Sequence, residues 1–334
     1  MVELLGSELD TILEETSRSF YLSLKVLPPK IRSQVSLLYL LARTSDTIAD
    51  SEAGEPESRL EALKQYNDHA QGRSDVLPDL SELAQMQTNA SESRLLDCMS
   101  ETVASIDRFP DSDQLHIRRC LDIIVGGQTL DLERFSHATE GNIVSLVNDS
   151  ELDDYAYKVA GSVGEFWTQM ALSHLFQTNS ETRTALFNKG IRFGKALQMI
   201  NILRDIPEDL RLGRCYMPSE VMKEHNLTTE DLHDSASMDR FRPMFDEYIG
   251  IASRHLGAAA EYIGMLPHGQ FRLRGACMMP VLIGQRTLTL LLQNNVLDAG
   301  NRIKVTRTEI KQMRNRTILA LPLVGRSRKL LESH

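Results

Sequence analysis

The sequence predicts an all-α protein. Three observations indicate this: apolar residues recur with helical periodicity, no stretch alternates apolar and polar residues as a half-buried strand does, and glycine and proline number only 19 and 11 in 334 residues. The segments predicted as helices are 34–50, 58–71, 93–107, 112–135, 152–176, 181–206, 239–264, 270–294 and 306–322. No Pro-, Ser- or Gly-rich linker divides the chain, so we expect one all-helical domain over residues 1–334, with a core from about 10 to 322.

Charge and cysteine content exclude several classes of function. The chain has 37 Lys and Arg against 46 Asp and Glu, a net charge of -9, so we expect no nucleic-acid partner, because such a partner needs a basic footprint. The four cysteines form no CxxC pair, which argues against a zinc or dithiol site and favours a reducing, cytoplasmic location. No signal peptide and no run of ~20 apolar residues is evident, so we expect no transmembrane anchor.

The predicted helix at 34–50 carries a polar stripe on an otherwise apolar surface. The stripe residues are spaced 4, 3 and 4 apart and fall within about 60° of arc: Tyr39, Arg43, Asp46 and Asp50. Leucines and Ile48 fill the other faces. A surface helix has a wide polar face, so this pattern predicts a core helix whose narrow stripe faces an internal polar cavity.

A second stripe repeats this pattern near the end of the helix predicted at 181–206. Its members, spaced 3, 4 and 4 apart, are Gln198, Asn201, Asp205 and Asp209, and Arg204 lies beside them. Pro207 interrupts the second Asp-x-x-x-Asp and cannot donate to the carbonyl of residue i−4. We therefore expect Asp209 on a bent or terminating turn.

Each pair of carboxylates needs a cation. Asp residues at i and i+4 repel each other, and Mg²⁺ prefers oxygen ligands while it bridges one or two carboxylates to substrate phosphates. Two such pairs predict a clamp for diphosphate groups, to which Arg43 and Arg204 add phosphate contacts. The alternative is that each motif decorates a solvated helix and that the arginines form ordinary ion pairs. Two motifs on apolar helices favour the clamp.

The chain resembles the squalene/phytoene synthase family in four segments that follow the family's order and spacing. They are SRSF (Ser17–Phe20), LLYLLARTSDTIAD, DYAYKVAGSVGEFW (Asp154–Trp167) and LQMINILRDIPEDLRLGRCYMP (Leu197–Pro218). The resemblance implies an isoprenoid-synthase fold, a helical bundle around a central cavity. It also implies head-to-head condensation of two prenyl diphosphates. Pro207 departs from the family pattern and leaves the reach of Asp209 open.

The resemblance also implies roles for individual residues. It assigns Mg²⁺ (with Mn²⁺ as an alternative) and diphosphate to Asp46, Asp50, Asp205 and Asp209. The supporting substrate contacts are Tyr39, Arg43, Gln198, Asn201, Arg204, Ser17, Ser19 and Phe20. Tyr155 matches a tyrosine near the reacting carbons, where it is expected to act in catalysis by stabilising a cation or relaying a proton; the alternative is a core tyrosine with a satisfied hydroxyl. Asp131 either lines the cavity or bonds between helices.

Three local features resemble the squalene branch, which reduces its intermediate with NADPH. They are the LARTSDTIAD and GRCYMP versions of the motifs, the segment RGACMMPVL (Arg274–Leu282) and the basic strip RIKVTR (Arg302–Arg307). Within the basic strip, Lys304 and Arg307 are the best-matched bases for the cofactor phosphates. No GxGxxG accompanies a strand, so no Rossmann site is expected.

The expected function is therefore that of a squalene synthase acting on farnesyl diphosphate through presqualene diphosphate. The alternatives are a phytoene, dehydrosqualene or presqualene diphosphate synthase, or a non-catalytic helical scaffold. A hydrocarbon product adds the expectation of peripheral contact with the inner face of the membrane. The small residues Ala160, Gly161 and Gly164 suit either close helix packing or a prenyl channel.

Overall fold

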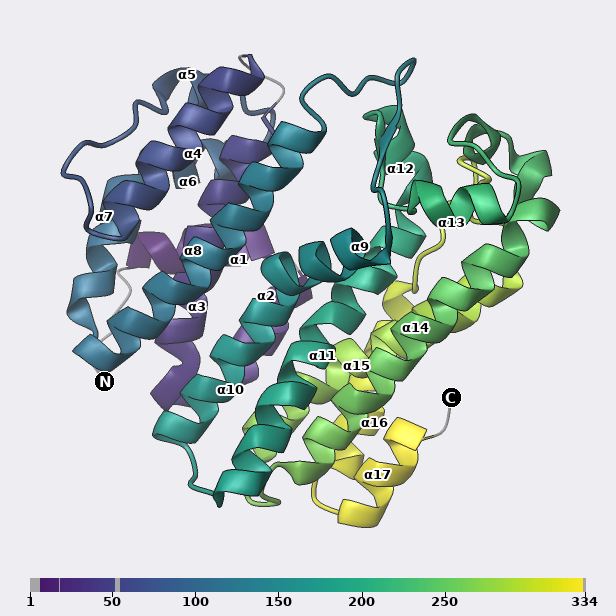
Figure 1. Ribbon diagram of the computed structural model, residues 1–334. Coiled ribbons are helices and arrows are strands. Elements are labelled where there is room, and N and C mark those ends of the chain that lie inside the picture. The colour runs from purple at the N-terminus through teal and green to yellow at the C-terminus, as the bar shows by residue number, and fades with distance from the viewer. Residues whose placement is uncertain (1–6, 18, 52–54, 333–334) are drawn as a thin grey trace. The chain divides into compact units, whose positions relative to one another are not determined.

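The structure, a computed structural model, describes residues 7–17, 19–51 and 55–332. Helices dominate the described chain, and the strands are limited to one two-stranded pair (Figure 1). The all-α prediction is confirmed. Contacts divide the chain into two compact units, residues 1–136 with 166–177 and residues 137–165 with 178–334. The expectation of one domain stays a prediction.

The first unit contains the N-terminal helices. Its elements are α1 (Ser7–Ser17), α2 (Ser19–Val26), α3 (Pro29–Ala49), α4 (Pro56–Ala70), α5 (Ser81–Met86), α6 (Ala90–Asp97), α7 (Met99–Ala104), η1 (Ser105–Arg108), α8 (Asp111–Arg134) and most of α10 (Ser162–His174). α3 packs against α4, α6, α7 and α8 and is the central helix of this unit.

A buried polar cluster ties three helices of the first unit together. Asp113, in the first turn of α8, is 1% exposed and accepts a hydrogen bond from Gln34 Nε2 of α3 at 3.0 Å. His174, at the end of α10, lies 2.8 Å from the other carboxylate oxygen. An acid at a helix N-terminus and a His at a helix C-terminus both match the helix dipoles, so the cluster is stable despite its burial.

The second unit contains the C-terminal helices. Its elements are β1 (Val144–Ser145), α9 (Asp149–Ala156), η2 (Tyr157–Gly161), the start of α10, α11 (Ser180–Arg204), α12 (Ile206–Arg211), β2 (Arg214–Cys215), α13 (Ser219–Glu224), η3 (Glu230–His233), η4 (Ser235–Ser237), α14 (Met238–Met265), α15 (Phe271–Gln293), α16 (Arg307–Ala320) and α17 (Val324–Glu332). α11 and α14 run side by side and form the largest contact within this unit (Figure 1).

Glycines allow η2 and the start of α10 to pack very closely on α11. A Cβ atom at Gly164 would lie 1.9 Å from the carbonyl oxygen of Gly190, and one at Gly194 would lie 2.0 Å from that of Ala160. These contacts are between backbones, so no side chain can move aside. Of the two interpretations of the small residues, close packing accounts for Gly164.

α15 is the one helix, among the residues that the structure describes, that has the length and composition to cross a membrane. Its most apolar 18-residue window has a mean hydropathy of 1.3, and 56% of that window is buried. It packs on α11, α14 and α16. Such burial is typical of a core helix.

Candidate active site

The first acidic motif lies on α3, whose other faces are buried. Leu37 and Leu40 are fully buried in the first unit. The predicted stripe follows the less buried side of the helix: Tyr39, Arg43, Asp46 and Asp50. The helix ends at this motif, because Asp50 is its C-cap and donates its backbone N–H to the Asp46 carbonyl at 2.8 Å.

Two side chains hold the Asp46 carboxylate. Arg43 Nη1 lies 3.1 Å from Oδ2, and Gln128 Nε2 of α8 donates to Oδ1 at 2.9 Å. Gln128 is 8% exposed, and its Oε1 atom is buried with no hydrogen-bond partner among the described residues. The Gln128 amide oxygen next to the Asp46 carboxylate is therefore available to a ligand. The Asp46 side chain itself is 45% exposed, so solvent reaches the site.

The pKa of Asp46 is raised to about 6. Desolvation by the surrounding protein is the largest cause, and the Asp50 carboxylate adds to it, while Arg43 and Gln128 act in the opposite direction. The motif thus carries more negative charge than its neighbours neutralise. A bound cation would relieve this excess.

This shift predicts a pH-dependent stability. A carboxyl group whose folded pKa lies above its unfolded value destabilises the fold as pH rises from about 4 to about 6, because the unfolded chain ionises first. Without metal, we expect Asp46→Asn to gain stability relative to the parent chain across this window and to keep that gain at higher pH. Urea unfolding of both proteins from pH 4 to 7.5 measures the difference. If the difference in the free energy of unfolding between the two proteins stayed constant with pH, the raised pKa of Asp46 would be contradicted.

Arg43 and Tyr39 have further partners within the first unit. Arg43 also pairs with Glu92 of α6, a residue that the sequence did not single out. The Tyr39 hydroxyl donates to the Thr16 carbonyl at 3.1 Å, and burial raises the pKa of Tyr39. These bonds hold both side chains on the same side of α3 as Asp46.

The SRSF segment is only partly described. Ser17 is buried, and its hydroxyl donates to the Leu13 carbonyl within α1. The backbone of Ser19 begins α2, but the side chains of Ser19 and Phe20 lie outside the described residues. The substrate contacts expected of these residues stay predictions.

Asp131 lies on α8, three residues after Gln128. That spacing puts both side chains on one side of the helix. Asp131 is half-buried. Asp131 therefore lies on the same side of α8 as Gln128, which contacts Asp46. Its two predicted roles, lining the cavity or bonding between helices, stay predictions.

The second acidic motif spans a helix break. Asp205 is the C-cap of α11 and the N-cap of α12, and Pro207 stands in the first turn of α12, where the missing N–H is not needed. The Asp209 N–H still donates to the Asp205 carbonyl at 2.9 Å, so the two carboxylates remain one turn apart. The bent turn predicted at Pro207 is confirmed. Gln198 is half-buried and Asn201 is exposed on the preceding turns.

Two arginines contact the second motif. Arg204 Nε lies 2.8 Å from Asp205 Oδ1. Arg302 approaches from the chain between α15 and α16, 3.5 Å from Asp205 Oδ1 and 3.2 Å from Glu208 Oε1. Glu208 thus adds a third acid to this part of the second unit.

Arg302 belongs to the basic strip, but it is not one of the two bases expected to bind cofactor. Lys304 and Arg307 are exposed, and neither makes an ion pair with the second motif in the described residues. The strip therefore reaches the motif through its first residue. Arg302 is part of the RIKVTR strip that the sequence singled out, but the resemblance to the family pointed to Lys304 and Arg307.

Tyr155 stacks on a second tyrosine in the second unit. The rings of Tyr155 and Tyr216 lie 4.8 Å apart between centroids, with an interplanar angle of 18°, and the Tyr155 hydroxyl lies 3.3 Å from that of Tyr216. A parallel pairing of β1 with β2 brings them together, because it joins the chain before α9 to the chain that leads into Tyr216. Tyr216 was not among the predicted residues.

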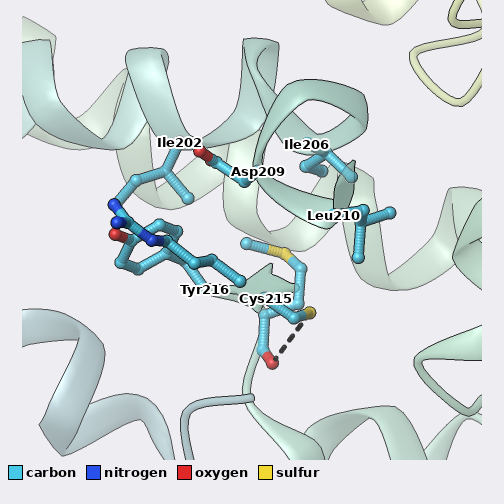
Figure 2. A pocket seen from close by; sticks show the side chains of 8 residues that line it. Ile202, Ile206, Asp209, Leu210, Cys215 and Tyr216 are labelled. Carbon is cyan, nitrogen blue, oxygen red and sulfur yellow. Dashed lines mark hydrogen bonds between the residues drawn. The ribbon is translucent and has the colours of Figure 1, made fainter. Parts of the chain in front are cut away.

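Tyr216 also lines a small cavity with Asp209. Figure 2 shows Asp209, Tyr216 and the apolar Ile202, Ile206 and Leu210 around this cavity of about 10 Å³. Its volume corresponds to about one water molecule. Tyr155 therefore stacks on a residue that lines the same cavity as Asp209 of the second acidic motif.

A comparison with protein families identifies the chain. The model of the squalene/phytoene synthase family matches residues 13–309. The chain belongs to this family. Members of the squalene/phytoene synthase family are enzymes of the prenyltransferase type, which use divalent metal with diphosphate substrates.

Curated relatives in the family have different products. The chain is 32% identical over 216 residues to presqualene diphosphate synthase of Sinorhizobium fredii, covering 64% of this chain and 63% of the relative. It is 28% identical over 259 residues to a bifunctional lycopene cyclase/phytoene synthase of Colletotrichum graminicola, covering 76% of this chain and 41% of the relative. The chain thus spans less than two thirds of the length of these proteins.

Solved structures of the family share the fold. TcSQS in complex with the ligand E5700 superposes with a TM-score of 0.76 at 20% identity, over 98% of this chain and 99% of that one. A dehydrosqualene synthase gives a TM-score of 0.66 at 20% identity, over 94% and 95% of the two chains. The isoprenoid-synthase fold of the squalene/phytoene synthase family is therefore confirmed.

The residues present fit the metal that the family uses. No group of three or more His, Cys, Asp or Glu side chains within residues 7–17, 19–51 and 55–332 could hold a metal by itself. Each motif supplies two carboxylates, and Mg²⁺ commonly takes one or two carboxylates together with waters and substrate phosphates. The raised pKa of Asp46 and the unpartnered Oε1 of Gln128 also suit a cation with bound water.

Proposed function

We propose that this protein is a squalene synthase that condenses two molecules of farnesyl diphosphate head to head. The observation that carries the proposal is the repeated pairing of an i, i+4 carboxylate pair with an arginine, Arg43 beside Asp46 and Arg204 beside Asp205. Family membership supports the prenyl substrate. Head-to-head condensation requires two diphosphates to be bound and released, and two motifs suit that need.

Asp46, Asp50, Asp205 and Asp209 would hold Mg²⁺ (or Mn²⁺) with the diphosphates, and the metal would neutralise the leaving group when bound. Arg43 and Arg204 are each already charge-paired, so they can turn to a phosphate oxygen at little cost in desolvation. We assign phosphate or substrate positioning also to Tyr39, Gln198, Asn201, Asp131 and the Ser17–Phe20 segment.

We assign Tyr155 to the carbocations that form when the diphosphate leaves. The stacked pair of Tyr155 and Tyr216 presents a fixed aromatic face, and aromatic faces attract cations. The first condensation releases one diphosphate and one proton to give presqualene diphosphate. The hydroxyl pair can carry that proton away from carbon, because Tyr155 and Tyr216 are within hydrogen-bond distance of each other.

The basic strip supports the reductive step. Lys304 and Arg307 are exposed cations within six residues of Arg302, which contacts the second motif. Such side chains fit the phosphates of NADPH, which would supply the hydride that ends the reaction at squalene. The hydrocarbon product supports peripheral contact with the membrane, and the four cysteines without a CxxC pair support a cytoplasmic location.

Product analysis tests this proposal. The purified protein is incubated with farnesyl diphosphate and Mg²⁺, with and without NADPH, and the lipids are identified by mass spectrometry. We expect squalene only with NADPH and presqualene diphosphate without it. Phytoene from geranylgeranyl diphosphate, or dehydrosqualene with NADPH present, would overturn the squalene assignment. No diphosphate release from any prenyl diphosphate would indicate a non-catalytic scaffold.

A presqualene diphosphate synthase is the second candidate. The relative from Sinorhizobium fredii favours it. In that case presqualene diphosphate would remain the final product when NADPH is present. The carboxylate motifs and the tyrosine pair would have the same roles, and the basic strip would have none in reduction.

A further inference from the structure

Positive charge is concentrated at the C-terminal end of the described chain. Residues 302–332 contain nine Lys and Arg against two acidic residues, a net charge of +7 in a chain whose total is -9. The rest of the sequence is therefore strongly acidic. A local excess of this size in an acidic protein indicates a surface with a partner of its own.

Seven of these nine bases lie on α16 and α17, which α15 holds in place, and the other two, Arg302 and Lys304, precede α16. Arg286 Nε of α15 lies 2.8 Å from Glu309 Oε1 in the first turn of α16, and Gln285 donates to the Leu331 carbonyl of α17 at 2.7 Å. Thr317 and Ala320 are the buried residues of α16. One side of α16 is thus fixed to the protein, and its other side faces solvent.

The solvent-facing side combines basic and apolar side chains. Lys311, Arg314 and Ile318 are exposed and spaced three and four residues apart, so they form one stripe of α16. Ile318, Leu319 and Leu323 are 60%, 70% and 47% exposed at the junction of the two helices. Further exposed bases lie on the same two helices: Arg316 on α16 and Arg326 and Lys329 on α17. None of the five bases makes an ion pair with a described residue.

We propose that this basic and apolar surface of α16 and α17 docks the protein on an anionic lipid bilayer. Shallow insertion of aliphatic side chains next to cations that meet lipid phosphates is the usual mode of interfacial helices. Three aliphatic side chains bury roughly 300 Å², well below the ~800 Å² per partner of a stable dimer. A nucleic acid would meet the bases with its phosphates but would leave Ile318, Leu319 and Leu323 exposed to water.

The surface supplies a location for the peripheral membrane contact in the proposed function, and in that sense the inference rests on it. Farnesyl diphosphate and squalene both have long apolar chains, so a bilayer is a natural source of substrate and a natural acceptor of product. Docking itself needs neither substrate nor metal. It is therefore measured separately from catalysis.

Vesicle co-sedimentation of the full chain tests the inference. We expect binding to vesicles of phosphatidylcholine with 30% phosphatidylglycerol, weaker binding to pure phosphatidylcholine, and loss of binding as salt rises. Each removed cation should weaken binding about fivefold, so Lys311→Gln/Arg314→Gln/Arg316→Gln should weaken it about 100-fold. Ile318→Ser/Leu319→Ser should also weaken it, at any salt concentration.

The matched control is Lys30→Gln/Lys64→Gln/Lys223→Gln, which changes net charge equally at exposed lysines on other elements. It should bind vesicles as the parent chain does. The inference would be overturned if the control lost as much vesicle binding as the triple variant of α16. It would also be overturned if the protein bound a DNA duplex as tightly as vesicles, or if it formed a dimer and did not bind vesicles. If product analysis fails but vesicle binding follows this pattern, only the proposed catalysis is wrong.

Discussion

Replacing Asp46 with asparagine should lower kcat for diphosphate release by about 10³-fold and leave the helical fold intact. The carboxylate lies between Arg43 and Gln128 and next to Asp50, and asparagine can keep the contact with Gln128 but not the charge. Under the proposed function, a metal at the first motif would then lose one of its two carboxylate ligands. Release of diphosphate from farnesyl diphosphate, followed by a phosphate-coupled assay, measures the effect.

The matched control is Asp68→Asn. Asp68 is also an aspartate of the first unit in an ion pair, with Arg73 Nε at 2.8 Å, but it lies outside both motifs. We expect near-parent activity from this control and a parent-like helical circular dichroism spectrum from both variants. Substantial metal-dependent turnover by Asp46→Asn would show that the first motif does not hold the metal.

Replacing Gly164 with alanine should destabilise the protein by more than about 3 kcal/mol or prevent folding. The new Cβ would lie 1.9 Å from the Gly190 carbonyl oxygen, and only separation of the start of α10 from α11 could relieve the clash. Urea unfolding followed by circular dichroism gives the free energy of unfolding. Gly161→Ala should have a smaller effect, because its nearest atom, at 3.0 Å, belongs to the Tyr157 side chain.

Gly257→Ala provides the control for that series. Gly257 lies within α14, and a Cβ there meets nothing within 4 Å. Alanine should stabilise this helix by up to about 1 kcal/mol. If Gly164→Ala were as stable as Gly257→Ala, the close packing of α10 on α11 would be incorrect.

Most of the fold follows from local periodicity. The long helices α8, α11 and α14 lie within two residues of their predicted bounds, because each repeats its apolar pattern over several turns, whereas α3 begins at Pro29, five residues before its predicted start. The short helices α5, α12 and α13 have six residues each and were not predicted, because fewer than two turns carry no period.

The candidate site could be predicted only where it is local. The stripe of Tyr39, Arg43 and Asp46 is a property of one helix, so its spacing along one side of α3 was predictable, while the internal polar cavity that it was expected to face stays a prediction. The contacts of Gln128 with Asp46 and of Arg302 with Asp205 join residues far apart in the sequence. No periodicity encodes which helix comes alongside another, so these partners needed the structure.

The pairing of β1 with β2 has a consequence for the order in which the protein assembles. It joins Val144 to Arg214, 70 positions along the chain, and the stacked pair of Tyr155 and Tyr216 lies just beyond these strands in the sequence. Helices form within microseconds, whereas a contact of this separation must first close a long loop. We therefore expect helical structure to form early during refolding, and the tyrosine pair to appear among the last steps.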